Sequence, residues 1–305
     1  MSGALPAASL VLATLAQAAP RFEVAVEAVK LDVFVAHEGQ PVLGLKQENF
    51  VVEDNGVRQQ VRLLDIAQVD VAAVLVFDTS GSLAGRALGH LQAGARALLR
   101  DLRHADRAAL VTFDDAPSLR VELTPDIGRV AEAIGRIQPG GRTALHDGLY
   151  CGLVLPTGAA RRLVVLFTDG DDNASWLGAD QLLLDAARSE ALVQIVAVVP
   201  DDATARSGPG LFLGRPAPSP DALAARSRWL RSVAEVTGGR YWEAEATERL
   251  EATFVQILRE MSTRYLLAFE PTGVERQGEH QLRIRLAGAT GRVRARTRYV
   301  VPPSR

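Results

Sequence analysis

The sequence predicts an α/β fold, in which a doubly wound, mostly parallel sheet is flanked by helices and a small β-module is formed by the two ends of the chain. Four apolar runs, VAAVLVF, RAALVTF, RLVVLFT and LVQIVAVV, alternate with amphipathic segments between residues 71 and 199. Continuous apolar strands separated by helices are typical of a parallel sheet that is buried on both faces. Alternating apolar and polar residues before and after this centre favour half-buried strands.

The strands of the β-module are expected at both ends of the chain. Residues 22–66 carry near-alternating apolar positions, and the Asp-Asn-Gly sequence at 54–56 is a tight-turn signal between two strand-like runs. Residues 265–305 return to alternation, and we expect them to pack with the N-terminal module. The main domain then covers residues 70–264 and is inserted into the β-module.

Four further segments complete the main domain. Residues 201–220 are rich in Gly, Pro and small residues, which predicts a long loop before a helix over SPDALAARSRWLRSVAEVTGG. RYWEAE follows this helix as a last strand, and ATERLEATFVQILREMSTR follows as a last helix with apolar residues at helical spacing. The regular alternation of strands and helices therefore extends to the end of the domain.

Composition removes several classes of function. The chain has 305 residues, 48% hydrophobic and 23% charged, and its net charge of −2 provides no general attraction to nucleic acid. Its only lysines are Lys30 and Lys46, so the main domain has no P-loop or Schiff-base lysine. The single cysteine, Cys151, lies in the apolar stretch LYCGLVL and is expected to be a small core residue.

The N-terminal segment predicts export. Residues 4–19 form a short apolar run that ends in Ala-Gln-Ala at 16–18, a pattern like a signal-peptidase site, so residues 1–19 are interpreted as a signal peptide. The run is shorter than the roughly 20 residues that cross a bilayer. No basic segment precedes it, which leaves a cytoplasmic protein as the alternative.

Oxygen-bearing side chains gather at the expected carboxyl ends of the strands, where ligands collect in open α/β sheets. The first strand of the main domain delivers Asp78, Ser80 and Ser82, the third delivers Asp169, and Thr143 stands in a turn before a helix. Carboxylates and hydroxyls suit hard cations, Mg²⁺ first with Mn²⁺ and Ca²⁺ as alternatives. Neutral hydroxyl ligands would leave such an ion under-neutralised, so a carboxylate from another molecule would complete the coordination.

These residues resemble the metal-ion-dependent adhesion site of von Willebrand factor type A domains, which have a Rossmann-like fold. The motif pieces are Asp78-x-Ser80-x-Ser82, Thr143 within GGRTALHDGL and Asp169 within LFTDGDD. The resemblance implies that these five residues hold the metal. It also implies a non-enzymatic module for adhesion or scaffolding, whose protein ligand supplies a carboxylate to the ion.

The flanking segments are similar to one bacterial branch of that family, the proteins first described in acidobacteria. The N-terminal pattern is PVxGLxxxNF over residues 41–50, and the C-terminal pattern is YLLAFxP over residues 265–271 with RVRARTRYV after it. Ala268 stands where the family usually has glycine. The resemblance covers nearly all of the chain after residue 22.

Residues around the five candidates have simpler interpretations. Residues 171–173 extend the acidic loop and are interpreted as a solvated turn. His146 is expected to cap or pack near the site, and residues 114–115 end the neighbouring strand at the same edge of the sheet. Gly81 is expected to give the turn the freedom that brings Ser80 and Ser82 toward one ion.

Enzymatic alternatives lack essential parts. Asp-Thr-Ser-Gly at 78–81 is like an aspartic-protease turn, but the chain has no second such turn. A Gly-x-Ser-x-Gly elbow is absent, and Ser80 occupies the second position of an Asp-x-Asp phosphotransferase motif. A metal-dependent hydrolase stays open as a remote alternative. The other alternative to an exported binding module is a cytoplasmic adaptor for a chaperone-like ATPase or a metal-insertion complex.

Overall fold

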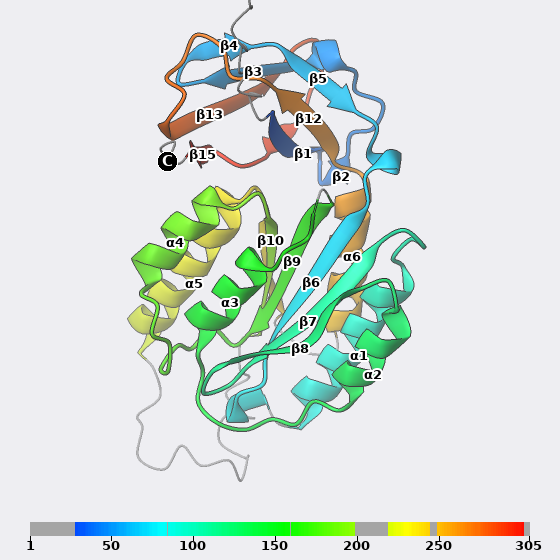
Figure 1. Cartoon of the computed structure of the whole chain (residues 1–305), viewed down its shortest axis with the longest axis vertical. Helices are drawn as coiled ribbons and strands as arrows, with labels where there is room; N and C mark the ends of the chain where they lie inside the picture. The colour runs from blue at the N-terminus through cyan, green and yellow to red at the C-terminus, as the bar shows by residue number, and fades with distance from the viewer. Residues whose placement is uncertain (1–27, 84, 159, 199–218, 245–248, 302–305) are drawn as a thin grey trace, which may run out of the picture.

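The computed structural model describes residues 28–83, 85–158, 160–198, 219–244 and 249–301. The expected signal peptide, and all of the expected 201–220 loop but its last two residues, lie outside these ranges. Within them the chain forms a helix-covered sheet with a β-module at one end of it (Figure 1). The α/β fold class predicted from the sequence is confirmed.

The central sheet has the order β11-β10-β9-β6-β7-β8, and all neighbours are parallel except β7 and β8. The four apolar runs form four of its strands. Nearly every residue in them is buried, as their composition predicts for strands covered on both faces. Its strands are β6 (Val71–Asp78), β7 (Arg107–Phe113), β8 (Pro117–Thr124), β9 (Arg161–Thr168), β10 (Leu192–Val198) and β11 (Arg240–Ala244).

Helices cover both faces of this sheet. Alternate residues of β6 point to opposite faces, so Leu75 and Phe77 join the core under α1, α2 and α6, while Val74 and Val76 join the core under α3, α4 and α5 (Figure 1). No helix in the described ranges is long and apolar enough to cross a membrane. The helices are α1 (Arg86–Arg100), α2 (Ile127–Gly135), α3 (Leu145–Val154), α4 (Ala179–Arg188), α5 (Pro220–Val236) and α6 (Leu250–Ser262).

The β-module combines strands from both ends of the chain in two sheets, β14-β1-β12-β5 with β2 beside β1, and β15-β13-β3-β4. Both sheets contribute to one apolar core that includes Leu31, Phe50 and Phe269. Asn55 and Gly56, both at positive φ, make the expected tight turn between β3 and β4. The strands are β1 (Val29–His37), β2 (Gln40–Pro41), β3 (Phe50–Asp54), β4 (Val57–Gln59), β5 (Val61–Leu64), β12 (Tyr265–Phe269), β13 (Gly278–Leu286), β14 (Arg292–Arg294) and β15 (Arg298–Val301).

The β-module packs against the amino ends of the parallel strands. Arg161, the first residue of β9, is paired with Asp32 of β1, and Arg264 donates to Glu260 at 2.8 Å and to the Asp32 carbonyl at 3.0 Å. The carboxyl ends of the parallel strands therefore face away from the β-module (Figure 1). Among the residues that the structure describes in full, three 3₁₀ turns are present, η1 (Gln47–Asn49), η2 (Ile66–Gln68) and η3 (Gly81–Leu83), and η3 lies at those carboxyl ends.

Candidate metal centre

Asp78 ends β6 as a fully buried carboxylate that is held by hydroxyl groups. Its Oδ1 accepts from the Ser80 amide at 2.9 Å and from Ser80 Oγ at 2.5 Å, and its Oδ2 accepts from Thr168 Oγ1 at 2.8 Å. Ser80 and Thr168 are themselves buried. The strand end therefore fixes one carboxylate and one of the predicted hydroxyl ligands in contact with each other.

A second carboxylate lies near enough to Asp78 to oppose its ionisation. Burial of Asp78, followed by the negative charge of Asp169, raises the pKa of the Asp78 carboxyl from 3.8 to about 7, although hydrogen bonds from Ser80 and Thr168 favour its charged form. A cation between the two carboxylates would remove this repulsion and compensate for the burial. The electrostatics of the site thus suit a positive ion.

The turn before α3 is bonded to the end of β6. The Gly140 amide donates to the Thr79 carbonyl at 2.8 Å, and the Gly81 amide donates to the Gly141 carbonyl at 3.4 Å. Gly141 has φ +74°, and a Cβ there would lie 2.8 Å from Asp115 Oδ2, so the turn requires glycine. These bonds bring Thr143, which is buried, to the edge that holds Asp78.

The loop after β9 is bonded to the same turn through residues that the sequence suggested were only a solvated turn. Asn173 Oδ1 accepts from the Thr143 amide at 3.0 Å, and the amide of Asn173 donates to the Thr143 carbonyl at 2.9 Å. Asp172 Oδ1 accepts from the Leu145 amide at 2.9 Å, at the start of α3. That interpretation is wrong for Asp172 and Asn173, because they join the Asp169 loop to the Thr143 turn.

Arg226 of α5 supports the Asp169 loop from the other side. Its guanidinium donates to the Asp169 carbonyl at 3.0 Å and to Asp171 Oδ1 at 2.8 Å. Gly170 between them has φ +85°, and a Cβ there would lie 2.6 Å from Arg226 Cδ. Nothing in the local sequence indicated Arg226, because it is 57 residues from Asp169 and lies in an ordinary amphipathic helix.

Trp176 extends into solvent from this loop with 97% of its surface exposed. Its backbone is nevertheless fixed, since Asp147 of α3 accepts from the amides of Trp176 and Leu177 at 2.9 Å each. Ala174, two residues earlier, donates to the Thr143 carbonyl at 3.1 Å. A large apolar side chain is therefore exposed on the loop that follows Asp169, next to the start of α3.

The remaining predicted neighbours have structural contacts. His146 lies 4.7 Å from the Trp229 ring, and its Nδ1 is 2.9 Å from the Leu177 carbonyl, in agreement with a packing role. Asp115 pairs with Arg142 at 2.7 Å. Gly81 has an ordinary φ and only one van der Waals neighbour at the position of a Cβ, so the expectation that the turn needs its freedom is wrong.

The donor set fits a hard cation that also depends on hydroxyl ligands. Asp78 is hydrogen-bonded to Ser80, and the negative charge of Asp169 acts on Asp78. Thr143 is brought to the same edge of the sheet. Ser82 belongs to η3, but its side chain lies outside what the structure describes. Among the described residues, no group of three or more His, Cys, Asp and Glu side chains could hold a metal ion. Hydroxyl groups, water or a partner would have to complete the coordination.

Comparison with known proteins identifies the class of domain. Residues 73–171 match the family model described as the von Willebrand factor type A domain. The chain therefore carries a von Willebrand factor type A domain, and domains of this class are mostly non-enzymatic modules for protein interaction. No curated protein matches the sequence.

Solved structures share the fold at low sequence identity. The von Willebrand factor type A protein from Catenulispora acidiphila is 15% identical, with a TM-score of 0.52 over 85% of this chain and 75% of its own. BatB from Bacteroides thetaiotaomicron is 14% identical, with a TM-score of 0.47 over 63% and 98% of the two chains. The vWF domain of the type V pili tip protein Mfa5 from Porphyromonas gingivalis is 14% identical, with a TM-score of 0.47 over 64% and 95%.

Proposed function

We propose that this protein is a metal-ion-dependent binding module that captures an acidic residue of a protein partner. The observation that carries the proposal is the pair of carboxylates, Asp78 and Asp169, at one strand edge with buried hydroxyl groups beside them. A module of this kind has no need of a general base. Its role would be adhesion or the assembly of a protein complex, and it would not be catalytic.

Five residues would hold the ion, Mg²⁺ first among Mg²⁺, Mn²⁺ and Ca²⁺. Ser80, Ser82 and Thr143 would supply neutral hydroxyl oxygens, while Asp78 and Asp169 would supply the negative charge. When bound, the cation supplies a Lewis-acidic position for an anionic oxygen. Asp172, Asn173 and Arg226 have positioning roles in this proposal, since they fix the Thr143 turn and the Asp169 loop relative to each other.

The exposed side chain of Trp176 favours a protein, and not a small anion, as the ligand of the module. Tryptophan is enriched among the residues that contribute most to protein interfaces, and a fixed backbone lowers the entropy that is lost on binding. A partner that places a carboxylate on the metal would reach the indole of Trp176 at the same edge of the domain. We propose that the partner segment carries an apolar residue close to its acidic one.

Metal binding is the first test. Calorimetric titration with MgCl₂ should show one site in the wild type, and Asp169→Asn should weaken it by about tenfold or more, since a charge-assisted ligand is lost. Asp180→Asn is the matched control, because Asp180 is an exposed aspartate in the first turn of α4. Equal Mg²⁺ affinity in all three proteins would contradict the proposed ligand set.

Partner capture is the second test. Immobilised wild type in Mg²⁺ should retain a protein from extracts of the native cells and release it in EDTA, whereas Asp169→Asn should not retain it. Trp176→Ala should retain Mg²⁺ affinity and bind the same protein at least about tenfold more weakly, as expected for an interface anchor. Retention that is the same in EDTA and in Mg²⁺ would count against a metal-dependent module.

We further propose that the module acts outside the cytoplasm, in the periplasm, at the cell surface or as a secreted protein. The support is the apolar run at 4–19 with its small-residue end. N-terminal sequencing of protein from its native host should find a start close to residue 19 or 20. An intact residue 1 or 2 would favour the cytoplasmic adaptor instead.

A further inference from the structure

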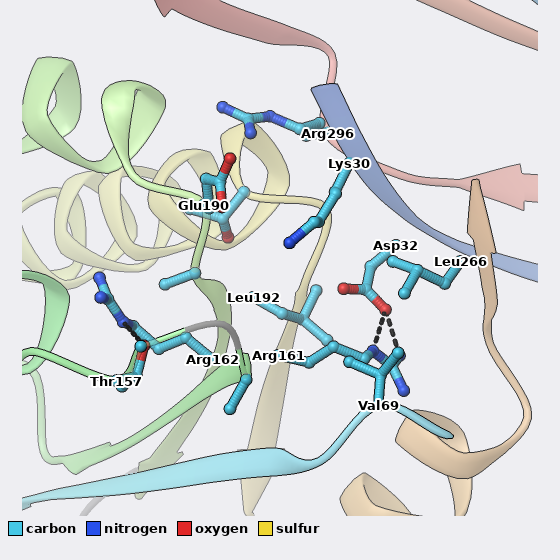
Figure 2. A pocket seen from close by; sticks show the side chains of 14 residues that line it. Lys30, Asp32, Val69, Thr157, Arg161, Arg162, Glu190, Leu192, Leu266 and Arg296 are labelled. Carbon is cyan, nitrogen blue, oxygen red and sulfur yellow. Dashed lines mark hydrogen bonds and ion pairs between the residues drawn. The ribbon is translucent and has the colours of Figure 1, made fainter. Parts of the chain in front are cut away.

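A cavity of about 80 Å³ lies between the β-module and the α/β domain, at the opposite end of the sheet from the candidate metal centre (Figure 2). Its walls come from β1, from the segment between β14 and β15, and from the starts of β9 and β10. A volume of this size holds about five water molecules or one tetrahedral oxyanion. The charged side chains that line it are Lys30, Asp32, Arg161, Arg162, Glu190 and Arg296.

The cavity carries an excess of positive charge. Four cationic side chains and two carboxylates line it, which leaves two positive charges without a matching negative charge in its walls. Asp32 is already bonded to Arg161. Of the two carboxylates in the cavity walls, Glu190 is then the one whose negative charge acts on Arg162 and Arg296.

Two of the guanidinium groups are withdrawn from solvent. Arg161 is 7% exposed and Arg296 is 9% exposed. Burial lowers the pKa of both Arg162 and Arg296, with the nearby charge of Glu190 acting in the opposite direction. Positive charge that is buried without full compensation is unfavourable, and a bound anion would relieve this cost.

The cationic side chains are held in place by the surrounding backbone. Arg296 donates from Nε to the Arg298 carbonyl at 3.1 Å and from Nη2 to the Ala187 carbonyl at 2.9 Å. Arg162 donates from Nε to Thr157 Oγ1 at 3.2 Å and from Nη1 to the Leu153 carbonyl. Guanidinium groups that are already ordered lose little entropy when they bind an oxyanion.

Lys30 completes the arrangement from the β-module. Its side chain points into the space between Glu190 and Asp32 (Figure 2). Lysine and arginine side chains are hydrogen-bond donors only, so the ligand must be an acceptor on several sides. A tetrahedral oxyanion with two negative charges suits both the hydrogen-bond donors and the charge excess of the cavity.

We propose that this cavity binds a dianionic oxyanion of the phosphate class, held by Lys30 of the β-module and attracted by the positive charge of Arg162 and Arg296 in the cavity walls. The ligand contacts both parts of the molecule, so its binding stabilises the junction between them. This site is separate from the candidate metal centre, because the two lie at opposite ends of the central sheet.

Two substitutions change the net charge of the cavity in opposite directions. Lys30→Gln removes a cation, and Glu190→Gln removes the carboxylate that competes with the ligand. Both side chains belong to exposed residues, so neither change should impair folding. Lys46→Gln is the matched control, because Lys46 is the other lysine of the chain and lies outside the cavity.

The measurement is calorimetric titration with inorganic phosphate, together with the melting temperature, in EDTA and at constant ionic strength set with sodium chloride. We expect saturable binding to the wild type and to Lys46→Gln, binding about tenfold weaker to Lys30→Gln, and binding about threefold or more tighter to Glu190→Gln. Phosphate should also slow acetylation of Lys30 and leave Lys46 unchanged. EDTA keeps the result independent of the metal centre, so Asp169→Asn should bind phosphate like the wild type.

Two outcomes would overturn the proposal. An equal rise in melting temperature for all four proteins would be the general stabilising effect of phosphate as an excluded salt. Absence of binding heat in the wild type, with acetylation of Lys30 unaffected, would show that the cavity holds only water.

Discussion

Asp78 is the residue whose chemistry depends most on its surroundings. It is fully buried, and burial together with the charge of Asp169 raises its carboxyl pKa to about 7. A buried carboxylate beside another one is unfavourable unless a cation accompanies it. The same residue should therefore destabilise the metal-free protein and be essential to the metal-bound one.

Asp78→Asn should stabilise the metal-free protein at alkaline pH. In the unfolded chain the carboxyl ionises near pH 3.8, and in the folded chain near pH 7. A raised folded pKa means that stability is highest below pH 4 and is lost as the pH rises through 7. In EDTA at pH 8 the asparagine variant should be more stable by about 1–4 kcal/mol.

Urea unfolding at pH 4 and pH 8 measures this difference. Mg²⁺ should restore stability to the wild type at pH 8 and have no such effect on Asp78→Asn. A variant with the same dependence on pH as the wild type would show that Asp78 does not carry the unfavourable charge.

At the scale of elements, α3 is the helix that ties the candidate metal centre to the sheet. It begins directly after the Thr143 turn and lies against β6 and β7. Gly148 and Gly152 allow this approach, since a Cβ at Gly148 would lie 2.6 Å from Phe113 Cγ and one at Gly152 would lie 2.6 Å from Val76 Cγ2. The position of the Thr143 turn thus depends on Gly148 and Gly152, the small residues through which α3 contacts the sheet.

Gly148→Ala should destabilise the protein by about 1–3 kcal/mol, because the methyl group overlaps the Phe113 side chain in a packed core. Gly89→Ala in α1 is the matched control. Gly89 is exposed in a helix interior with nothing within 4 Å of a Cβ, so alanine should stabilise by about 0.5–1 kcal/mol. Denaturant midpoints measure both, and similar effects of the two changes would contradict the close packing of α3.

At the scale of the whole molecule, a buried ionic network joins the β-module to the α/β domain. Glu260 of α6 accepts from Arg264 at 2.8 Å, from Gln194 at 3.3 Å and from Arg294 of β14. Arg264 in turn donates to the Gly238 carbonyl at 2.6 Å. Because Glu260, Arg264 and Gln194 are buried, each depends on its partners for compensation.

Glu260→Gln should lower the stability of the whole chain by about 3–5 kcal/mol, since it leaves buried guanidinium charge without its carboxylate. Glu251→Gln is the control on the same helix, because its pair with Arg100 is exposed and should contribute at most about 1 kcal/mol. Scanning calorimetry should show one transition in the wild type. If Glu260→Gln melts like Glu251→Gln, the network does not hold the two parts together.

Different parts of the site were predictable to different degrees. Asp78, Ser80 and Asp169 follow apolar strands, and Thr143 precedes a helix, so local pattern was enough to select them. Asn173 was misinterpreted because its bond to Thr143 spans 30 residues, and no local signal reports such a contact. Arg226 was missed for the same reason.

The amino-acid sequence alone determined the α/β fold class, the strands of the central sheet and the oxygen-bearing residues at their ends, because periodicity and turn chemistry are local properties. The tertiary structure alone decided that Trp176 is exposed on the loop after Asp169 and that Lys30 and Arg296 share one cavity with Arg162. Burial and electrostatic interaction depend on distances between segments that are far apart in the chain, and only the folded molecule sets those distances.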